Sequence, residues 1–199
     1  PPPPPAAPPQ AAPRLFYQNP SQPLRFYEVS VNKEETVMYL TEAGMDNGNN
    51  LYVRDMTQAD AQFIQMCSDS RYIYAPVETV GNRMYILTNA GAPKYRLMVA
   101  DVSNPGYADW KELVGEGESV LEDVTCTAEN SMILQYAKDN CNQLYVYDTD
   151  GNRLSEIVLP TFGTTSVSGA RGQKELFYSF TSYTTPGAIY SYDMAPAES

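Results

Sequence analysis

The sequence predicts an all-β fold built from the four-stranded antiparallel blades of a β-propeller. Short runs alternate apolar and polar residues with turn-forming residues between them, which indicates strands. In addition, one four-strand unit recurs along the chain. Its third strand reads LYVRD, LMVAD, LYVYD and IYSYD, starting at residues 51, 97, 144 and 189. A repeat of about 46 residues is typical of a propeller blade.

Each unit is expected to contain four strands, except the last, which has three. The expected strands are 26–31, 36–41, 50–55 and 61–66; 72–80, 83–88, 95–101 and 110–114; 119–126, 131–137, 143–148 and 153–159; and 165–170, 175–180 and 188–193. Turn formers stand between several of them, at Asn47-Gly48, Gly81-Asn82 and Asp150-Gly151.

A unit of this length cannot bury enough surface to be stable alone, so successive sheets must stack on one another. Stacking on two sides requires strands that are apolar on both faces, as in VMYL (37–40) and MYIL (84–87). An aspartate ends every third strand, and we expect its carboxylate to open a turn by accepting backbone N–H bonds. A calcium site is the alternative, but one aspartate per blade does not supply six oxygens. The four residues are Asp55, Asp101, Asp148 and Asp193.

The chain divides into a low-complexity segment, 1–13, and a partial propeller domain, 14–199. The first segment, PPPPPAAPPQAAP, favours polyproline II and fits a linker or a ligand for a proline-recognising domain. The chain supplies about three and a half to four blades, which are too few to close a ring, because propellers have at least four blades and usually more. The chain is therefore either an arc of a larger propeller, or copies of it complete one another.

Composition excludes several classes of function. A net charge of −11 argues against nucleic-acid binding, which needs a basic face. No apolar run approaches the roughly 18 residues of a membrane span, and no secretory leader is visible. The compartment stays open between cytoplasmic and periplasmic or secreted. With no histidine in 199 residues, no hydrolase that uses imidazole as its base is complete within this chain.

The cysteines predict neither a disulfide framework nor a metal site. Cys67, Cys126 and Cys141 are an odd, scattered set without C-x-x-C spacing. Cys126 and Cys141 are expected at opposite ends of the strand between them, and so unpaired. We expect no cofactor.

Three stretches resemble the prolyl oligopeptidase family in the C-terminal part of its β-propeller. They are KYRLMVADVSNPGYADWKELVGEGESVLEDV (94–124), LYVYDTDGNRLSEIVLP (144–160) and ELFYSFTSYTTPGAIYSYD (175–193). The segment RLFYQNPSQPLRFYEVSVNKEE (14–35) also looks like a blade boundary of that family. The resemblance implies a seven-bladed propeller that caps an α/β-hydrolase domain, which cleaves short peptides after proline with a serine, aspartate and histidine triad. It also implies that the propeller excludes large folded proteins.

The chain lacks the catalytic motifs of that family. It has no G-x-S-x-G nucleophile elbow and no histidine, so no catalytic residue is carried over and the chain alone is expected to be inactive. The resemblance implies two partners: an α/β-hydrolase domain of the same parent protein, and short proline-containing peptides. It also places the loop Thr181–Thr185 on the hydrolase-facing side or at a blade edge. The alternative is an ordinary polar turn between two strands.

The resemblance suggests one substrate-facing loop, TEAGMDN (41–47). Glu42 and Met45 stand where some family members place an arginine and a cysteine near the bound peptide. A carboxylate in place of a guanidinium removes the pairing with a substrate carbonyl, whereas Met45 could form an apolar subsite wall. The alternative is an ordinary surface turn.

Three functions follow from these patterns. The first is the non-catalytic propeller of a prolyl oligopeptidase-like serine peptidase, which controls access of peptides to an active site outside this chain. The second is a stand-alone binding module in which two copies close into one ring. The third is recruitment of a partner by the proline-rich segment, with the strands serving only to display it.

Overall fold

The computed structural model describes residues 12–128 and 130–194, which form four antiparallel sheets. The proline-rich segment 1–13, for which a linker and a partner-binding segment were the alternatives, lies almost wholly outside the described residues. The strands are, sheet by sheet, β1 (Phe26–Val31), β2 (Val37–Ala43), β3 (Asn49–Asp55) and β4 (Ile64–Cys67); β5 (Tyr74–Val80), β6 (Arg83–Thr88), β7 (Arg96–Asp101) and β8 (Lys111–Val114); β9 (Val120–Thr127), β10 (Ser131–Lys138), β11 (Cys141–Asp148) and β12 (Arg153–Ile157); and β13 (Thr164–Ser168), β14 (Glu175–Thr181) and β15 (Ala188–Asp193).

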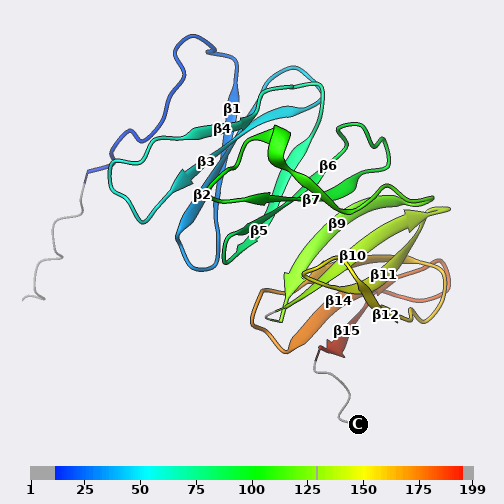
Figure 1. Ribbon diagram of the computed structural model, residues 1–199. Coiled ribbons are helices and arrows are strands. Elements are labelled where there is room, and N and C mark those ends of the chain that lie inside the picture. The colour runs from blue at the N-terminus through cyan, green and yellow to red at the C-terminus, as the bar shows by residue number, and fades with distance from the viewer. Residues whose placement is uncertain (1–11, 129, 195–199) are drawn as a thin grey trace, which may run out of the picture.

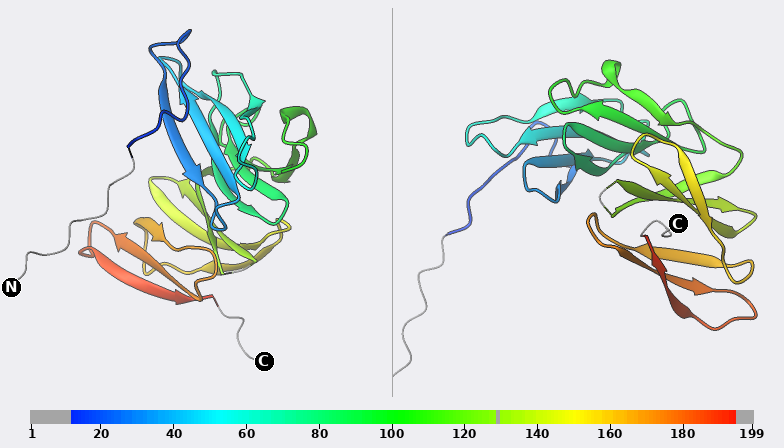
Figure 2. Two further views of the ribbon diagram at one scale, coloured as in Figure 1. Left: turned by 90° about the vertical axis from the view of Figure 1, so that its left-hand side faces the viewer. Right: turned by 60° about the horizontal axis from the view of Figure 1, so that its bottom comes forward.

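Every expected strand is present, and its ends differ by a few residues at most from the expected ones. Each sheet is a meander in which strands adjacent in sequence pair with each other. The four sheets follow one another in an arc, with the first and the fourth at its two ends (Figures 1 and 2). The arc of propeller blades is confirmed, and the described sheets do not close into a ring.

The first strands of the four sheets all begin on the same side of the arc, at one end of the axis around which the sheets are arranged. Backbone hydrogen bonds tie the segments that lead into the second and fourth sheets to the third strand of the sheet before, as between the Asn49 N–H and the Tyr72 carbonyl and between the Asn142 N–H and the Gly163 carbonyl. We call this the near end. Its loops include 44–48, 139–140, 158–163 and 182–187. The opposite end, where the first strands finish, is the far end, and it carries the turns 32–36 and 169–174.

The core consists of three apolar clusters, each lying between two neighbouring sheets. Strand β6 shows why both faces must be apolar. Met84 and Ile86 point into the cluster shared with the first sheet, while Tyr85 and Leu87 point into the cluster shared with the third. All four are buried. Alternation by two along a strand thus supplies both interfaces of a stacked sheet.

Residues 14–25 lie over the face of the first sheet that is turned away from the second. The ring of Tyr17 meets Tyr27 of β1, Tyr52 of β3 and Phe63, with centroids 5.4–6.5 Å apart. Below this segment Leu40 is almost completely buried although it belongs to none of the three clusters. The segment therefore covers apolar surface of the first sheet.

The predicted turn formers act in two different ways. Gly81 and Gly151 have positive φ angles of 59° and 85°, which glycine adopts without strain. Gly48 is needed for a close approach instead, because a Cβ there would lie 2.0 Å from the Tyr72 carbonyl oxygen. The two-residue turn Asp139-Asn140 was not predicted; its φ angles of 52° and 60° fit a tight hairpin turn.

Among residues 12–128 and 130–194 the only helix is the short 3-10 turn η1 (Tyr107–Asp109). It precedes the buried Trp110, whose indole N–H donates to the Pro105 carbonyl at 2.8 Å. No helix in the described part of the chain is long and apolar enough to cross a membrane.

Candidate functional site at the two ends of the arc

The near end carries the most exposed apolar side chains of the described residues. Five of them have more than three quarters of their surface exposed, and all five lie on near-end loops or just before β1: Leu24, Met45, Val158, Phe162 and Tyr183. Single exposed apolar residues are common on protein surfaces, but their concentration at one end marks a surface suited to contact with another body.

A hollow of about 710 Å³ opens at the near end of the third sheet. The turn after β10 and the segment after β12 form its walls, with Lys138, Cys141, Ile157, Val158 and Phe162 among the lining residues. Its size falls within the range of small-molecule and peptide subsites. Cys141 is half-buried here and, like Cys67 and Cys126, is a free thiol.

The structure separates the two residues proposed to face a substrate. Met45 lies on the near-end loop and is 88% exposed, whereas Glu42 lies within β2 and is 2% exposed. The Glu42 carboxylate accepts hydrogen bonds from Asn19 Nδ2 at 3.1 Å, Asn50 Nδ2 at 3.1 Å and the Tyr52 hydroxyl at 2.9 Å. A substrate role for either residue stays a prediction.

The environment of Glu42 favours its charged form. Burial opposes ionisation, but the hydrogen bonds from Asn50, Tyr52 and Asn19, together with the charge of Arg25, outweigh it and lower the pKa of the carboxyl. Burial, followed by the neighbouring carboxylate, raises the pKa of Tyr52 well above its usual value. Through the hydrogen bond from Asn19, the Glu42 carboxylate also links residues 14–25 to the first sheet.

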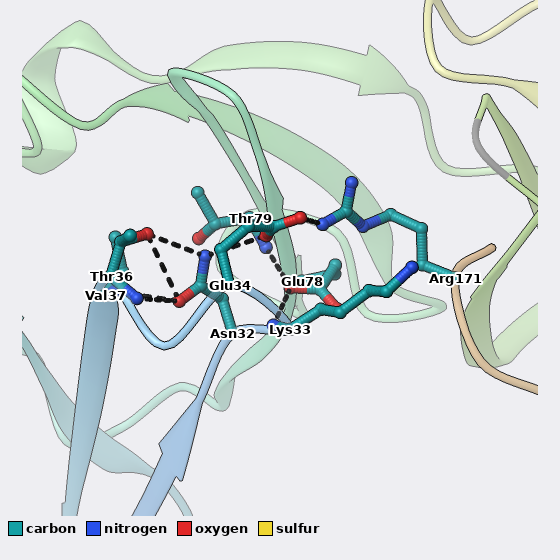
Figure 3. Close-up of polar contacts among 8 residues, drawn as sticks. All are labelled: Asn32, Lys33, Glu34, Thr36, Val37, Glu78, Thr79 and Arg171. Carbon is teal, nitrogen blue, oxygen red and sulfur yellow. Dashed lines mark hydrogen bonds and ion pairs between the residues drawn. The ribbon is translucent and has the colours of Figure 1, made fainter.

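The far end is polar and charged along its inner edge. In the turn between β1 and β2, Glu34 forms an ion pair with Arg171 from the turn between β13 and β14 (Figure 3). The Lys33 N–H lies 3.4 Å from Glu78 Oε1 of β5. Figure 3 shows Lys33 extending toward the Arg171 backbone while the Arg171 guanidinium extends toward Glu34.

Lys33, Glu78 and Arg171 line a second hollow, of about 440 Å³, to which all four sheets contribute. Lys33 comes from the first sheet, Glu78 from the second, Cys126 from the third and Arg171 from the fourth. The inner edge of the arc at the far end is thus a hollow in which charged side chains stand beside apolar ones such as Val31, Val77 and Val124. It contrasts with the apolar loops of the near end.

Three of the four aspartates that end the third strands accept backbone N–H bonds in the turn that follows, as predicted. Asp55 accepts the Thr57 N–H at 2.8 Å, Asp101 accepts the Ser103 N–H at 2.7 Å, and Asp148 accepts the Asp150 N–H at 2.9 Å. In the register of the sheet, each of these aspartates lies opposite the first residue of the second strand. Asp193 occupies the same register position in the fourth sheet. The carboxylate oxygens of Asp55, Asp101 and Asp148 thus stabilise turns, and a turn role for Asp193 stays a prediction.

Sequence reasoning missed the charged residues of the far end. Glu34, Glu78 and Arg171 stand in a turn, a strand and another turn of three different units. Charged residues in such places usually just face water, and nothing in their spacing indicates contact. Only the stacking of the sheets brings them together.

Four successive meander sheets, stacked side by side around an axis, define the class of this protein as a β-propeller arc. The family model for the prolyl oligopeptidase N-terminal β-propeller domain matches residues 8–199. The chain therefore belongs to the prolyl oligopeptidase family and lies within its propeller domain.

Individual relatives agree with this assignment. The chain is 30% identical over 178 residues to the prolyl endopeptidase of Elizabethkingia meningoseptica, a match that covers 89% of this chain and 25% of the relative. A solved structure from a mechanistic study of two prolyl endopeptidases superimposes with a TM-score of 0.82 at 25% identity, covering 90% of this chain and 26% of that one.

Prolyl oligopeptidase B from Galerina marginata, at 22% identity, shares the fold with a TM-score of 0.84 over 92% of this chain and 27% of its own. The chain thus spans about a quarter of the length of these relatives.

Proposed function

We propose that this chain is the non-catalytic propeller part of a prolyl oligopeptidase-like serine peptidase, and that it limits access of short proline-containing peptides to an α/β-hydrolase active site. Membership of the propeller family supports this proposal. So does the lack of histidine, because a serine, aspartate and histidine triad cannot be built from this chain. Catalysis then belongs to another domain of the same protein.

The main support for the proposal is the difference between the side chains of the near end and those of the far end. The exposed apolar loops of the near end, with Met45, Phe162 and Tyr183, suit burial against a catalytic domain. The far end, lined by Lys33, Glu78 and Arg171, suits the solvent side of a passage for peptides. A peptide would enter among charges and leave the arc beside the catalytic domain.

The test uses the full-length protein and a proline-linked chromogenic peptide. Replacing Phe162 and Tyr183 together by serine should lower kcat/KM several-fold, because the catalytic domain loses part of its contact surface. Leu154→Ser is the matched control: this side chain is exposed as well, but it lies on the outer strand β12. A full-length protein without prolyl peptidase activity would refute the proposal, and so would near-end variants that behave like the control.

Control of access has its own test. The full-length protein should cleave a short proline-containing peptide but not the same sequence placed in a loop of a stable folded protein. Equal cleavage of both substrates would show that the propeller does not select by size.

A further inference from the structure

Arg171 connects the fourth sheet to the first across the axis of the arc. It lies in the turn between β13 and β14, and its guanidinium pairs with the Glu34 carboxylate in the turn between β1 and β2 (Figure 3). The Arg171 side chain is only 8% exposed and that of Glu34 is 45% exposed. The pair is therefore partly withdrawn from water, where an attraction between opposite charges is screened less than at the surface.

This ion pair spans a distance in the fold that no apolar cluster spans. Among the described residues, each of the three clusters joins two sheets that follow one another along the chain. None of the three contains side chains from both the first and the fourth sheet. Their attraction is lost when the two turns move apart, so the pair favours the arrangement in which the two turns lie close together.

Hydrogen bonds hold both turns in place. Asn32 Oδ1 accepts the N–H groups of Thr36 at 2.9 Å and Val37 at 2.8 Å, and Asn32 Nδ2 donates to Glu34 Oε2 at 3.2 Å. On the opposite side, the Gly172 N–H donates to the Ala128 carbonyl at 2.7 Å. Glu34 and Arg171 thus stand on preorganised turns and lose little freedom when they pair.

We propose that Glu34 and Arg171 form a clasp that fixes the spacing between the first and fourth sheets at the far end. Arg171 lines the far-end hollow, so opening of the clasp should widen this hollow. The spacing can be measured without substrate. Only the effect on peptides rests on the proposed function.

The spacing is measured by pulsed electron spin resonance on the full-length protein with spin labels at Ser30→Cys and Ser168→Cys. Both positions are exposed and lie near the far end of β1 and β13. Cys141 is replaced by serine, and Cys67 and Cys126 remain buried. The clasp predicts one narrow distance distribution for the parent and a longer, broader one for Glu34→Gln and Arg171→Gln.

Two further variants make the result decisive. Asp150→Asn breaks the ion pair with Arg83, which joins the second and third sheets at 2.7 Å, and should leave the distribution unchanged. The exchange Glu34→Arg with Arg171→Glu should restore the narrow distribution. An unchanged distribution in Glu34→Gln, or a folded exchange variant that stays broad, would overturn the clasp. Circular dichroism verifies that each variant is folded.

The effect on peptides is a separate measurement on the same full-length variants. Glu34→Gln should raise cleavage of a cyclic proline-containing peptide relative to its linear form, because the ring is wider than an extended chain. A widened distance with an unchanged cyclic-to-linear ratio would overturn the role of the clasp in passage. Cleavage of the linear peptide reports separately on the proposed function.

Discussion

At the scale of single residues, an aspartate at the same position has the same role in three successive sheets. Asp55, Asp101 and Asp148 each close the turn after a third strand by accepting backbone N–H bonds. Hydrogen bonds from the side chains of Thr57, Ser103 and Asn152, respectively, are the main reason why the pKa values of these carboxyls are lowered. A turn that needs a charged acceptor makes the fold sensitive to acid.

Stability should therefore fall in acid. A carboxyl whose pKa in the folded state lies below its unfolded value of about 3.9 stabilises the fold above that pH, and this contribution is lost as the pH falls through the folded pKa. We expect the urea midpoint to drop as the pH is lowered from about 5 to about 3. The triple variant Asp55→Asn, Asp101→Asn, Asp148→Asn should show a shallower drop. Parallel pH profiles for variant and parent would contradict this account.

Glu42 is a buried charge whose partners require it. Glu42→Gln keeps the shape of the side chain but replaces an acceptor oxygen by an NH2 group facing the amide donors of Asn19 and Asn50 and the Tyr52 hydroxyl. We expect a loss of about 1–3 kcal/mol in the free energy of unfolding, measured with urea. Glu28→Gln on the exposed β1 is the control and should change stability by less than about 0.5 kcal/mol. Equal stability of both variants would show that the network contributes little.

At the scale of elements, each sheet depends on its neighbours. The middle strands β6 and β10 send alternate side chains into two different clusters, so neither face is free to be polar. The pairing of the third with the fourth strand shifts register in each of the first three sheets. Such bulges increase the local twist of a sheet and bend its outer strand.

The interface between sheets should dominate stability. Leu134 of β10 is completely buried in the cluster between the second and third sheets, and Leu134→Ala should cost about 2–5 kcal/mol. Leu154→Ala on the outer strand β12 removes the same atoms from an exposed position and should stay within about 0.5 kcal/mol of the parent. Urea unfolding of both variants provides the comparison. Similar losses would mean that stacking of the sheets is not the main source of stability.

At the scale of the whole molecule, the described sheets form an open arc whose first and fourth sheets both expose apolar side chains. Phe26, Val29 and Val31 of β1 are exposed, as are Phe177 and Ile189 of the fourth sheet. In the described residues, β15 is also an edge strand with one unpaired side. Exposed apolar patches and open edges mark sites of interaction or aggregation.

Residues 14–199 expressed alone should therefore self-associate. Size-exclusion chromatography is expected to show a mass that rises with concentration, or precipitation. Phe177→Ser with Ile189→Ser should reduce the effect, whereas Leu154→Ser on β12 should not. A stable monomer of residues 14–199 at high concentration would show that the exposed apolar side chains of the first and fourth sheets do not drive association.

Local sequence patterns were sufficient to predict the strands and most of the turns. Period-two alternation and turn formers located all the strands, and the spacing of the third strands predicted the blades. These signals are reliable because they depend on neighbours along the chain. Strand ends were less certain, as at Asp139-Asn140, where two non-glycine residues adopt positive φ angles.

The contacts between side chains of different sheets could not be predicted, because they form only when the sheets stack. No pattern near Glu34 indicates Arg171, and no pattern near Glu42 indicates that Asn19, Asn50 and Tyr52 would enclose it. The reason is physical. Strand formation is a local preference, whereas a charge cluster or a buried carboxylate depends on how far each sheet is rotated against the next, and that rotation is set by packing of the three apolar clusters.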